Sequence, residues 1–236
     1  MDIIAQVRKE IILQSTPDMK KSTLRFYKRP IKLHGLSCPK IRTISKKYFK
    51  EIKHLSKREI LDLCERLMQC GFQEEKIVAI DWARELDIEK KDFSFFERWL
   101  KQYINDWGLC DGFAPYILEK FLHFPETKRK MFQWTTSKNL YVRRAAAVSH
   151  LHDAGGSKPS KHDIQDRFKI AKALLYDEED LVQKAYGWLL KNASKTHPKE
   201  VYDFVMQHKA KMPRTALRYA IEYYSVDDKK RLMSKK

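Results

Sequence analysis

The stretch SKREILDLCERLMQ, residues 56–69, decides the fold class of this chain. Ser56 and Glu59 form an S-x-x-E capping box, in which each side chain bonds the backbone N–H of the other residue. The apolar residues recur at intervals of three and four, the spacing that places side chains on one face of an α-helix. They are Ile60, Leu63, Cys64 and Leu67. The stretch therefore predicts an amphipathic helix that begins directly after Ser56.

The same helical period returns along the rest of the chain. Two further stripes are Ile77, Ile80, Ala83, Leu86 and Phe168, Ala171, Leu174, Leu175. Ser37, two residues before Pro39, and Asp177, ahead of an acidic turn, mark further helix starts. No run alternates apolar and polar residues as a half-buried strand would, and glycine is scarce, with 7 residues. We expect an all-α fold.

The spacing of the helical segments predicts a repeat architecture. Short polar breaks separate segments of roughly 10–18 residues, and successive pairs recur at roughly 35–45 residues, the range of HEAT-like repeats. In such an α-solenoid, antiparallel helix pairs hide their apolar faces by stacking on their neighbours. We predict a single domain over residues 1–236. Because such stacks curve and the chain has a net charge of +17, we expect its concave face to be basic.

The charge balance favours a polyanionic partner. The chain has 48 Lys and Arg against 31 Asp and Glu, a net charge of +17, and a pI near 9.6. Such an excess attracts nucleic acid above all, although a soluble basic protein without a polyanion partner stays open. A membrane-surface role is less favoured, because the basic residues are scattered and not gathered on one amphipathic segment. No apolar run approaches the roughly 18 residues of a membrane-spanning helix.

Several other classes of site are poorly supported. Residues 1–15, MDIIAQVRKEIILQS, carry charges inside their apolar pattern, which predicts an amphipathic helix and not a signal peptide. His150 and His152 would diverge on a helix, so we expect no metal there. Residues 153–163, DAGGSKPSKHD, are expected to form a flexible loop. The cysteines lack C-x-x-C spacing, which favours a reducing cytoplasm over a zinc site or a disulfide framework. They are Cys38, Cys64, Cys70 and Cys110.

A tryptophan and an aspartate stand out in NDWGLCDGFAP, residues 105–115. On a helical wheel, Trp107 and Asp111 lie next to each other at the edge of an apolar stripe. That stripe comprises Cys110, Phe113, Ala114, Ile117 and Phe121. Pro115 removes the hydrogen bond to the carbonyl of residue 111 and should kink or restart the helix. Asp111 is thus expected at a core boundary, where a carboxylate can face a bound cation.

Two further segments contain unusual residues. Arg144 falls inside an apolar stripe, and a buried guanidinium needs an anionic partner. This leaves open a ligand phosphate or a structural ion pair between repeats. Arg143 lies further round the helix and is interpreted as surface charge. Trp188 shares a stripe with Leu181, Ala185 and Leu189, and by itself it fits a core residue as well as a site residue.

Four motifs resemble the AlkD-type DNA alkylation repair family, whose members are DNA glycosylases built from HEAT-like repeats. They are Trp107-Gly-Leu-Cys-Asp111 with the following Ala114-Pro115, the Arg144-Ala-Ala segment, Lys184-Ala-Tyr-Gly-Trp188, and LHGLSCPKIR at residues 33–42. The last is similar to an L-G-x-x-x-P-x-x-R pattern. The resemblance spans nearly the whole chain. The chain departs from the family between the two site residues, at Gly108, Leu109 and Cys110, which puts local rigidity in question.

The resemblance implies a base excision repair enzyme that hydrolyses the N-glycosidic bond of cationic N3- and N7-alkylated purines in double-stranded DNA, without a cofactor or metal. It places Trp107, Trp188 and Asp111 around the damaged nucleotide, with an N-terminal aromatic, Phe26 or Tyr27, lining the cleft. The residues assigned to DNA binding are Arg144, Arg143, Tyr27, Lys28 and Arg29. We expect a monomer in the cytoplasm, associated with the nucleoid through DNA.

The chemistry and one rival class of function complete the prediction. A cationic purine departs without protonation, so one carboxylate, Asp111, suffices where ordinary glycoside hydrolysis needs two. The alternative is a non-catalytic HEAT-like DNA-structure-binding or scaffold protein. A pure DNA binder has little reason to hold a carboxylate beside phosphates, which it repels. Single-stranded RNA binding would need repeated base-reading side chains, which the sequence lacks.

Overall fold

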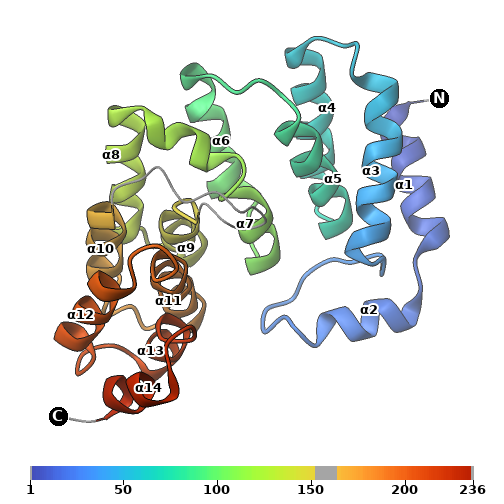
Figure 1. Ribbon diagram of the computed structural model, residues 1–236. Coiled ribbons are helices and arrows are strands. Elements are labelled where there is room, and N and C mark those ends of the chain that lie inside the picture. The colour runs from blue at the N-terminus through green and yellow to red at the C-terminus, as the bar shows by residue number, and fades with distance from the viewer. Residues whose placement is uncertain (1, 152–163, 235–236) are drawn as a thin grey trace. The chain divides into compact units, whose positions relative to one another are not determined.

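The computed structural model describes residues 2–151 and 164–234 (Figure 1). Within these ranges the regular structure is helical, apart from one isolated bridge between Lys32 and Phe72. The predicted all-α fold of packed helix pairs is confirmed. The chain divides into two compact units: unit 1 comprises residues 1–92 and 102–113, and unit 2 comprises residues 93–101 and 114–236. The single domain and the basic concave face stay predictions.

Unit 1 is built around the buried indole of Trp82. This side chain is fully buried, and its Nε1 donates a hydrogen bond of 3.0 Å to the Ser45 carbonyl oxygen. The bond ties together two of the helices that pack in this unit. The helices of unit 1 are α1 (Ile3–Gln14), α2 (Pro17–Leu24), α3 (Cys38–Ile52), α4 (Lys57–Gln69), α5 (Gln73–Arg84), the short 3₁₀ helix η1 (Lys90–Asp92) and α7 (Trp107–Phe113).

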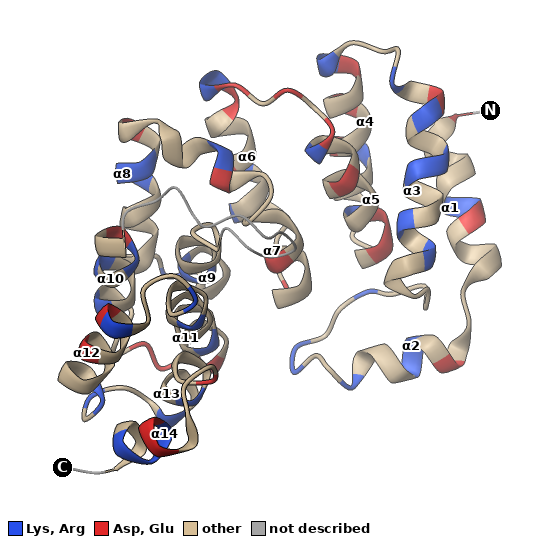
Figure 2. Ribbon diagram, viewed as in Figure 1, with Lys and Arg blue, Asp and Glu red and all other residues tan. Residues whose placement is uncertain are grey.

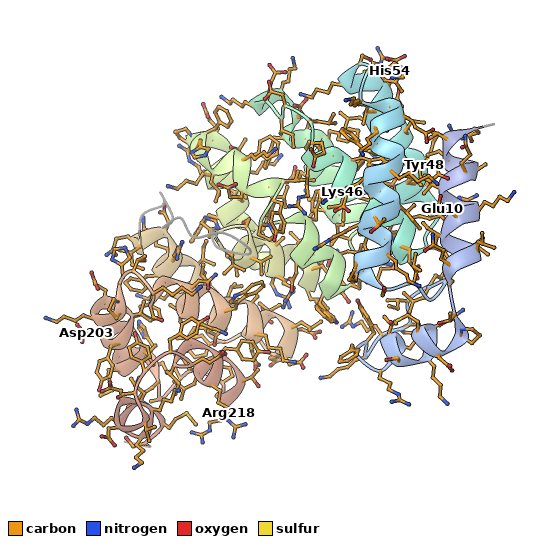
Figure 3. The ribbon with its side chains drawn as sticks, turned by 45° about the vertical axis from the view of Figure 1, so that its right-hand side comes forward. Glu10, Lys46, Tyr48, His54, Asp203 and Arg218 are labelled. Carbon is orange, nitrogen blue, oxygen red and sulfur yellow. The ribbon has the colours of Figure 1, made fainter. Side chains whose placement is uncertain are left out.

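The helix predicted from residues 56–69 is confirmed as α4. Ser56 is its N-cap, and both hydrogen bonds of the capping box with Glu59 are present. Its buried side is formed by Ile60, Cys64, Leu67 and Met68, which face the core because of their helical spacing. The amphipathic helix expected near the N-terminus is α1, and Figure 3 shows Glu10 and Tyr48 meeting between α1 and α3. There the Tyr48 hydroxyl donates to Glu10 Oε2 at 2.8 Å.

Unit 2 has an aromatic core of its own. Phe93 contacts Phe121 edge to face at a centroid distance of 5.2 Å and stacks on Trp134 at 5.9 Å. The buried Trp134 indole donates to Glu97 Oε1 at 3.0 Å, which satisfies its N–H. The helices of unit 2 are α6 (Phe93–Gln102), η2 (Leu118–His123), α8 (Pro125–Gln133), η3 (Trp134–Thr136), α9 (Leu140–Val148), α10 (Ile164–Ala173), α11 (Asp180–Ala193), α12 (Pro198–His208), α13 (Arg214–Ala220) and α14 (Val226–Met233).

Three local predictions have clear outcomes. Pro115 ends the helix as expected, because α7 stops at Phe113 and a turn follows before η2. The prediction that a helix starts at Asp177 is wrong, because the N-cap of α11 is Glu179. Asp177 Oδ1 instead accepts a hydrogen bond from the backbone N–H of Glu179 at 3.0 Å. Residues 152–163, which include His152 and the expected loop, lie outside the described residues.

Candidate functional site

Trp107 and Asp111 lie on α7 of unit 1, one turn apart. The helix begins at Trp107 because Asp106 caps it: Asp106 Oδ1 accepts from the Leu109 backbone N–H at 2.8 Å. The side of α7 that carries Leu109, Cys110 and Phe113 is buried. Trp107 and Asp111 are both half-buried, as expected for the edge of that apolar stripe.

Two residues of the segment that follows α2 hold the Trp107 indole. The rings of Tyr27 and Trp107 stack with centroids 5.4 Å apart and an interplanar angle of 21°. Trp107 Nε1 also donates to the carbonyl oxygen of Phe26 at 3.2 Å. The sequence left Phe26 and Tyr27 open as the aromatic that lines the cleft. Tyr27 is the one that stacks on Trp107, and its role in binding DNA stays a prediction. The Phe26 side chain points elsewhere, with 71% of its surface exposed.

A buried polar network holds the hydroxyl end of Tyr27. Gln73 Nε2 donates to the Tyr27 hydroxyl oxygen at 2.6 Å and to Asp106 Oδ1 at 3.2 Å. Gly108 makes room for this arrangement, because a Cβ there would lie 2.7 Å from the Tyr27 hydroxyl. The sequence departure at Gly108 therefore has a steric reason. One amide side chain joins the tyrosine that stacks on Trp107 to the aspartate that caps its helix.

The electrostatics of the network depend on burial. Asp106 is 3% exposed, and burial raises its pKa to about 6, against the opposing effects of the Leu109 N–H and the Lys76 charge. Burial also raises the pKa of Tyr27 to about 12, and the charges of Asp106 and Asp111 add to this rise. Tyr27, Trp107 and Asp111 share one region of unit 1.

A buried lysine supports the turn that precedes α7. Lys76 Nζ donates to the Tyr103 carbonyl oxygen at 2.8 Å and to Asn105 Oδ1 at 3.3 Å. Burial lowers the pKa of Lys76, while the nearby Asp106 charge opposes that change. No sequence pattern pointed to Gln73, Lys76 or Asp106. Their contacts join segments about 30 to 45 residues apart, and no local spacing encodes such contacts.

Trp188 and the two predicted arginines belong to unit 2. Trp188 lies on α11 and is half-buried, although its neighbours Ala185 and Leu189 are fully buried. It is therefore not a fully enclosed core residue. The preceding Gly187 allows α13 to approach, since a Cβ there would lie 2.7 Å from the Ala216 carbonyl oxygen.

Both arginines, on α9, make contacts within unit 2. Arg144 is buried, 5% exposed, and its guanidinium donates to the backbone carbonyl of Leu181. Arg143 forms the carboxylate pair: its Nε and Nη2 donate to the two oxygens of Asp177 at 2.6 and 3.2 Å. The interpretation of Arg143 as plain surface charge is wrong, because its side chain is only 17% exposed. DNA binding by either arginine stays a prediction.

Comparison with known proteins decides the family. The family model described as "DNA alkylation repair enzyme" matches residues 7–224. The chain belongs to the DNA alkylation repair enzyme family. Membership confirms the predicted resemblance, supports a role in repair of alkylated DNA and implies interaction with DNA.

A solved structure supports the fold assignment of this family member. It is described as "Predicted DNA alkylation repair enzyme from Enterococcus faecalis", and it superposes with a TM-score of 0.75 at 21% sequence identity. The match covers 90% of this chain and 98% of the other. A search among curated proteins found no significant match. The similarity therefore supports the helical architecture.

The N-terminal part of this family member has a large basic excess. Residues 19–50 contain 11 Lys and Arg and no Asp or Glu, and Figure 2 shows these basic residues along α2, α3 and the segment between them. Lys28 and Arg29, predicted to bind DNA, are both exposed here. The basic residues are thus less scattered than the sequence analysis assumed. They flank Tyr27, which stacks on Trp107.

The described residues show neither a metal site nor a membrane-spanning helix. Within residues 2–151 and 164–234, no group of three or more His, Cys, Asp or Glu is arranged to hold a metal ion. In the same ranges no helix is long and apolar enough to cross a membrane. His150 is buried, and its Nδ1 lies 3.0 Å from the Ala146 carbonyl oxygen, a contact within its own helix turn.

Proposed function

We propose that this family member is a DNA glycosylase that releases cationic N3- and N7-alkylated purines from duplex DNA. One observation carries the proposal: half-buried Asp111 follows one turn after an indole that a stacked ring and a hydrogen bond hold in place. Tyr27 stacks on one side of Trp107, and the Phe26 carbonyl accepts its N–H. A side chain held in this way can position a nucleotide beside the carboxylate.

The reaction requires little of the protein, because the leaving group is already activated. An N3- or N7-alkylated purine carries a positive charge and departs as a neutral base without a general acid. The deoxyribose then becomes positively charged as the N-glycosidic bond breaks. Asp111 stabilises this developing charge electrostatically and orients the attacking water, which adds to C1′ and loses a proton. The products are the free base and an abasic site.

The aromatic and basic residues bind the damaged DNA in this proposal. The indole of Trp107 attracts the cationic base by a cation–π interaction of roughly 0.5–2 kcal/mol. Trp188 of unit 2 is proposed as the second indole, a role that Trp188→Ala would test. Lys28 and Arg29 bind phosphates without reading sequence, together with the residues of unit 2 predicted for the same role, Arg143 and Arg144.

The proposal is tested by incubating the full-length protein with a duplex that contains a single N7-methylguanine. We expect release of the base and an alkali-labile abasic site, with no added metal or cofactor. An unalkylated duplex of the same sequence is the control. An undamaged purine is uncharged in DNA and would have to depart as an anion, so release from the control duplex should be undetectable. Release that proceeds equally from both duplexes would contradict the requirement for a purine that is positively charged before it departs.

A non-catalytic DNA-binding protein is the second candidate, and the basic residues 19–50 favour it independently of Asp111. A protein of that kind would bind the alkylated and the unalkylated duplex and release no base from either. Binding that falls steeply with salt is expected for both candidates, because each neutralises phosphates. The base-release assay therefore separates the two, and binding alone does not.

A further inference from the structure

Phe26 is a large aromatic residue of unit 1 whose side chain is exposed to solvent. It is 71% exposed, although its backbone is held in place. Its N–H donates to the Thr23 carbonyl oxygen at 3.1 Å, and its own carbonyl oxygen accepts from the Trp107 indole at 3.2 Å. The next residue, Tyr27, is fixed by its stack on Trp107. The ring is therefore presented to solvent from a well-anchored point of the chain.

Basic residues lie on both sides of Phe26 in the sequence. Residues 20–32, which we call the basic segment, contain six Lys and Arg and no Asp or Glu. All six are exposed: Lys20, Lys21, Arg25, Lys28, Arg29 and Lys32. Helix α2, at the start of the segment, has no buried residue, so it adds little to the core. A surface that combines clustered cations with an exposed aromatic matches a partner that carries both phosphates and flat apolar faces.

We infer that Phe26 stacks on a nucleobase of bound DNA while the cations of the basic segment bind the phosphates on either side. Exposed aromatics in positively charged grooves hold bases in this sequence-tolerant way, and apolar wedges also insert at base steps of duplex DNA. The inference rests on the family's interaction with DNA. It does not depend on the glycosylase reaction or on Asp111.

The two neighbouring aromatics thus have separate tasks. Tyr27 is covered by Trp107 and its hydroxyl is bonded to Gln73, so it belongs to the site itself. Phe26 faces outward and contacts DNA beyond the site. An anionic membrane is the other surface that an aromatic among cations fits, but α2 has only 8 residues and no apolar stripe long enough to lie in a lipid interface.

The test compares four variants by their affinity for an undamaged duplex across a salt series. Phe26→Ala removes the ring, Phe26→Leu keeps an apolar side chain without a π face, and Phe26→Trp restores a stacking ring. Leu13→Ala is the matched control, because Leu13 is 80% exposed on α1 and lies outside the basic segment. Both positions are on the surface, so the four variants should keep the wild-type melting temperature.

We expect Phe26→Ala and Phe26→Leu to weaken binding about 5- to 150-fold, the range for losing one base-stacking aromatic. Phe26→Trp and Leu13→Ala should bind like wild type. The slope of log Kd against log salt should stay unchanged in all four, because no phosphate contact is lost. Replacing Lys28 by alanine should instead reduce that slope by about 0.9.

Three outcomes would overturn the inference. One is Phe26→Leu binding as tightly as wild type, since stacking would then not be the interaction. Another is Phe26→Ala binding DNA like Leu13→Ala. The third is that Phe26→Ala binds vesicles of phosphatidylserine and phosphatidylcholine more weakly than wild type does but binds DNA equally well. If the variants weaken DNA binding but wild type releases no N7-methylguanine, the stacking inference stands and the glycosylase proposal fails.

Discussion

A single methyl group at Gly108 should disturb the site through one identifiable contact. The Cβ of Gly108→Ala would lie 2.7 Å from the Tyr27 hydroxyl oxygen, a distance that real Cβ atoms do not tolerate. It would also lie 3.2 Å from Asp106 Oδ1 and 3.3 Å from Gln73 Nε2, which are tight but adjustable contacts. The hydroxyl must therefore move, and its hydrogen bond with Gln73 is the first interaction to be lost.

The magnitude is a balance of two opposing effects. Alanine in place of a helical glycine would by itself stabilise the chain by roughly 0.5–1 kcal/mol. Overpacking in a filled region costs about 1–3 kcal/mol, and the lost hydrogen bond about 0.5–1.5 kcal/mol. We expect Gly108→Ala to lower the free energy of unfolding by about 1–3 kcal/mol. Gly112→Ala is the control on the same helix, because its Cβ would meet no atom within 4 Å.

A double-mutant cycle with Tyr27→Phe isolates the contact. Removing the hydroxyl removes the atom that the new methyl group strikes, so Gly108→Ala should become neutral or stabilising by up to about 1 kcal/mol in that background. Urea unfolding followed by tryptophan fluorescence measures all four corners of the cycle. The reasoning is refuted if Gly108→Ala destabilises the chain equally with and without the hydroxyl, or if it matches Gly112→Ala.

The remaining predictions concern charge and helix packing. Burial raises the pKa of Asp106 from 3.8 to about 6, so the folded chain holds this proton more tightly than the unfolded chain. The free energy of unfolding of wild type, relative to that of Asp106→Asn, should thus fall by up to about 3 kcal/mol as pH rises from about 4 to 7. Urea unfolding measures both proteins, and the same pH dependence in the two would contradict this. Gly187→Ala should destabilise the chain by about 1–3 kcal/mol, because its Cβ would lie 2.7 Å from the backbone oxygen of Ala216. An unchanged melting temperature would show that α13 can shift.

Features encoded by neighbouring residues could be predicted from the sequence. The helix α4 followed from the Ser56–Glu59 capping box and the apolar period, both of which act within a few residues. The end of α7 followed from Pro115, which cannot supply a helical N–H. The positions of Trp107 and Asp111 at the edge of the core followed from the same periodicity. The motif resemblance to the repair family, confirmed over residues 7–224, is what predicts a role for them in the site.

Features that depend on distant contacts could not be predicted. Gln73 reaches Tyr27 and Asp106 only after the chain has folded, and nothing in its local sequence marks it. The burial of Arg143 and Arg144 was predicted from helical phase, which does not show that Arg143 pairs with Asp177, 34 residues further along the chain. A glycine whose absent side chain makes room for a hydroxyl, as at Gly108, has no periodic signature.

The central claim is that the Asp111 carboxylate stabilises the sugar while the cationic purine departs. Single-turnover release of N7-methylguanine by Asp111→Asn tests it most directly, with Asp203→Asn as a control at an exposed aspartate of α12. Loss of the charge should slow release by about 2–4 kcal/mol of barrier, while duplex binding is kept or tightened because a repulsive charge near phosphates is gone. Asp203→Asn should react at the wild-type rate. An Asp111→Asn protein that frees the base as fast as wild type would show that this carboxylate takes no part in the reaction.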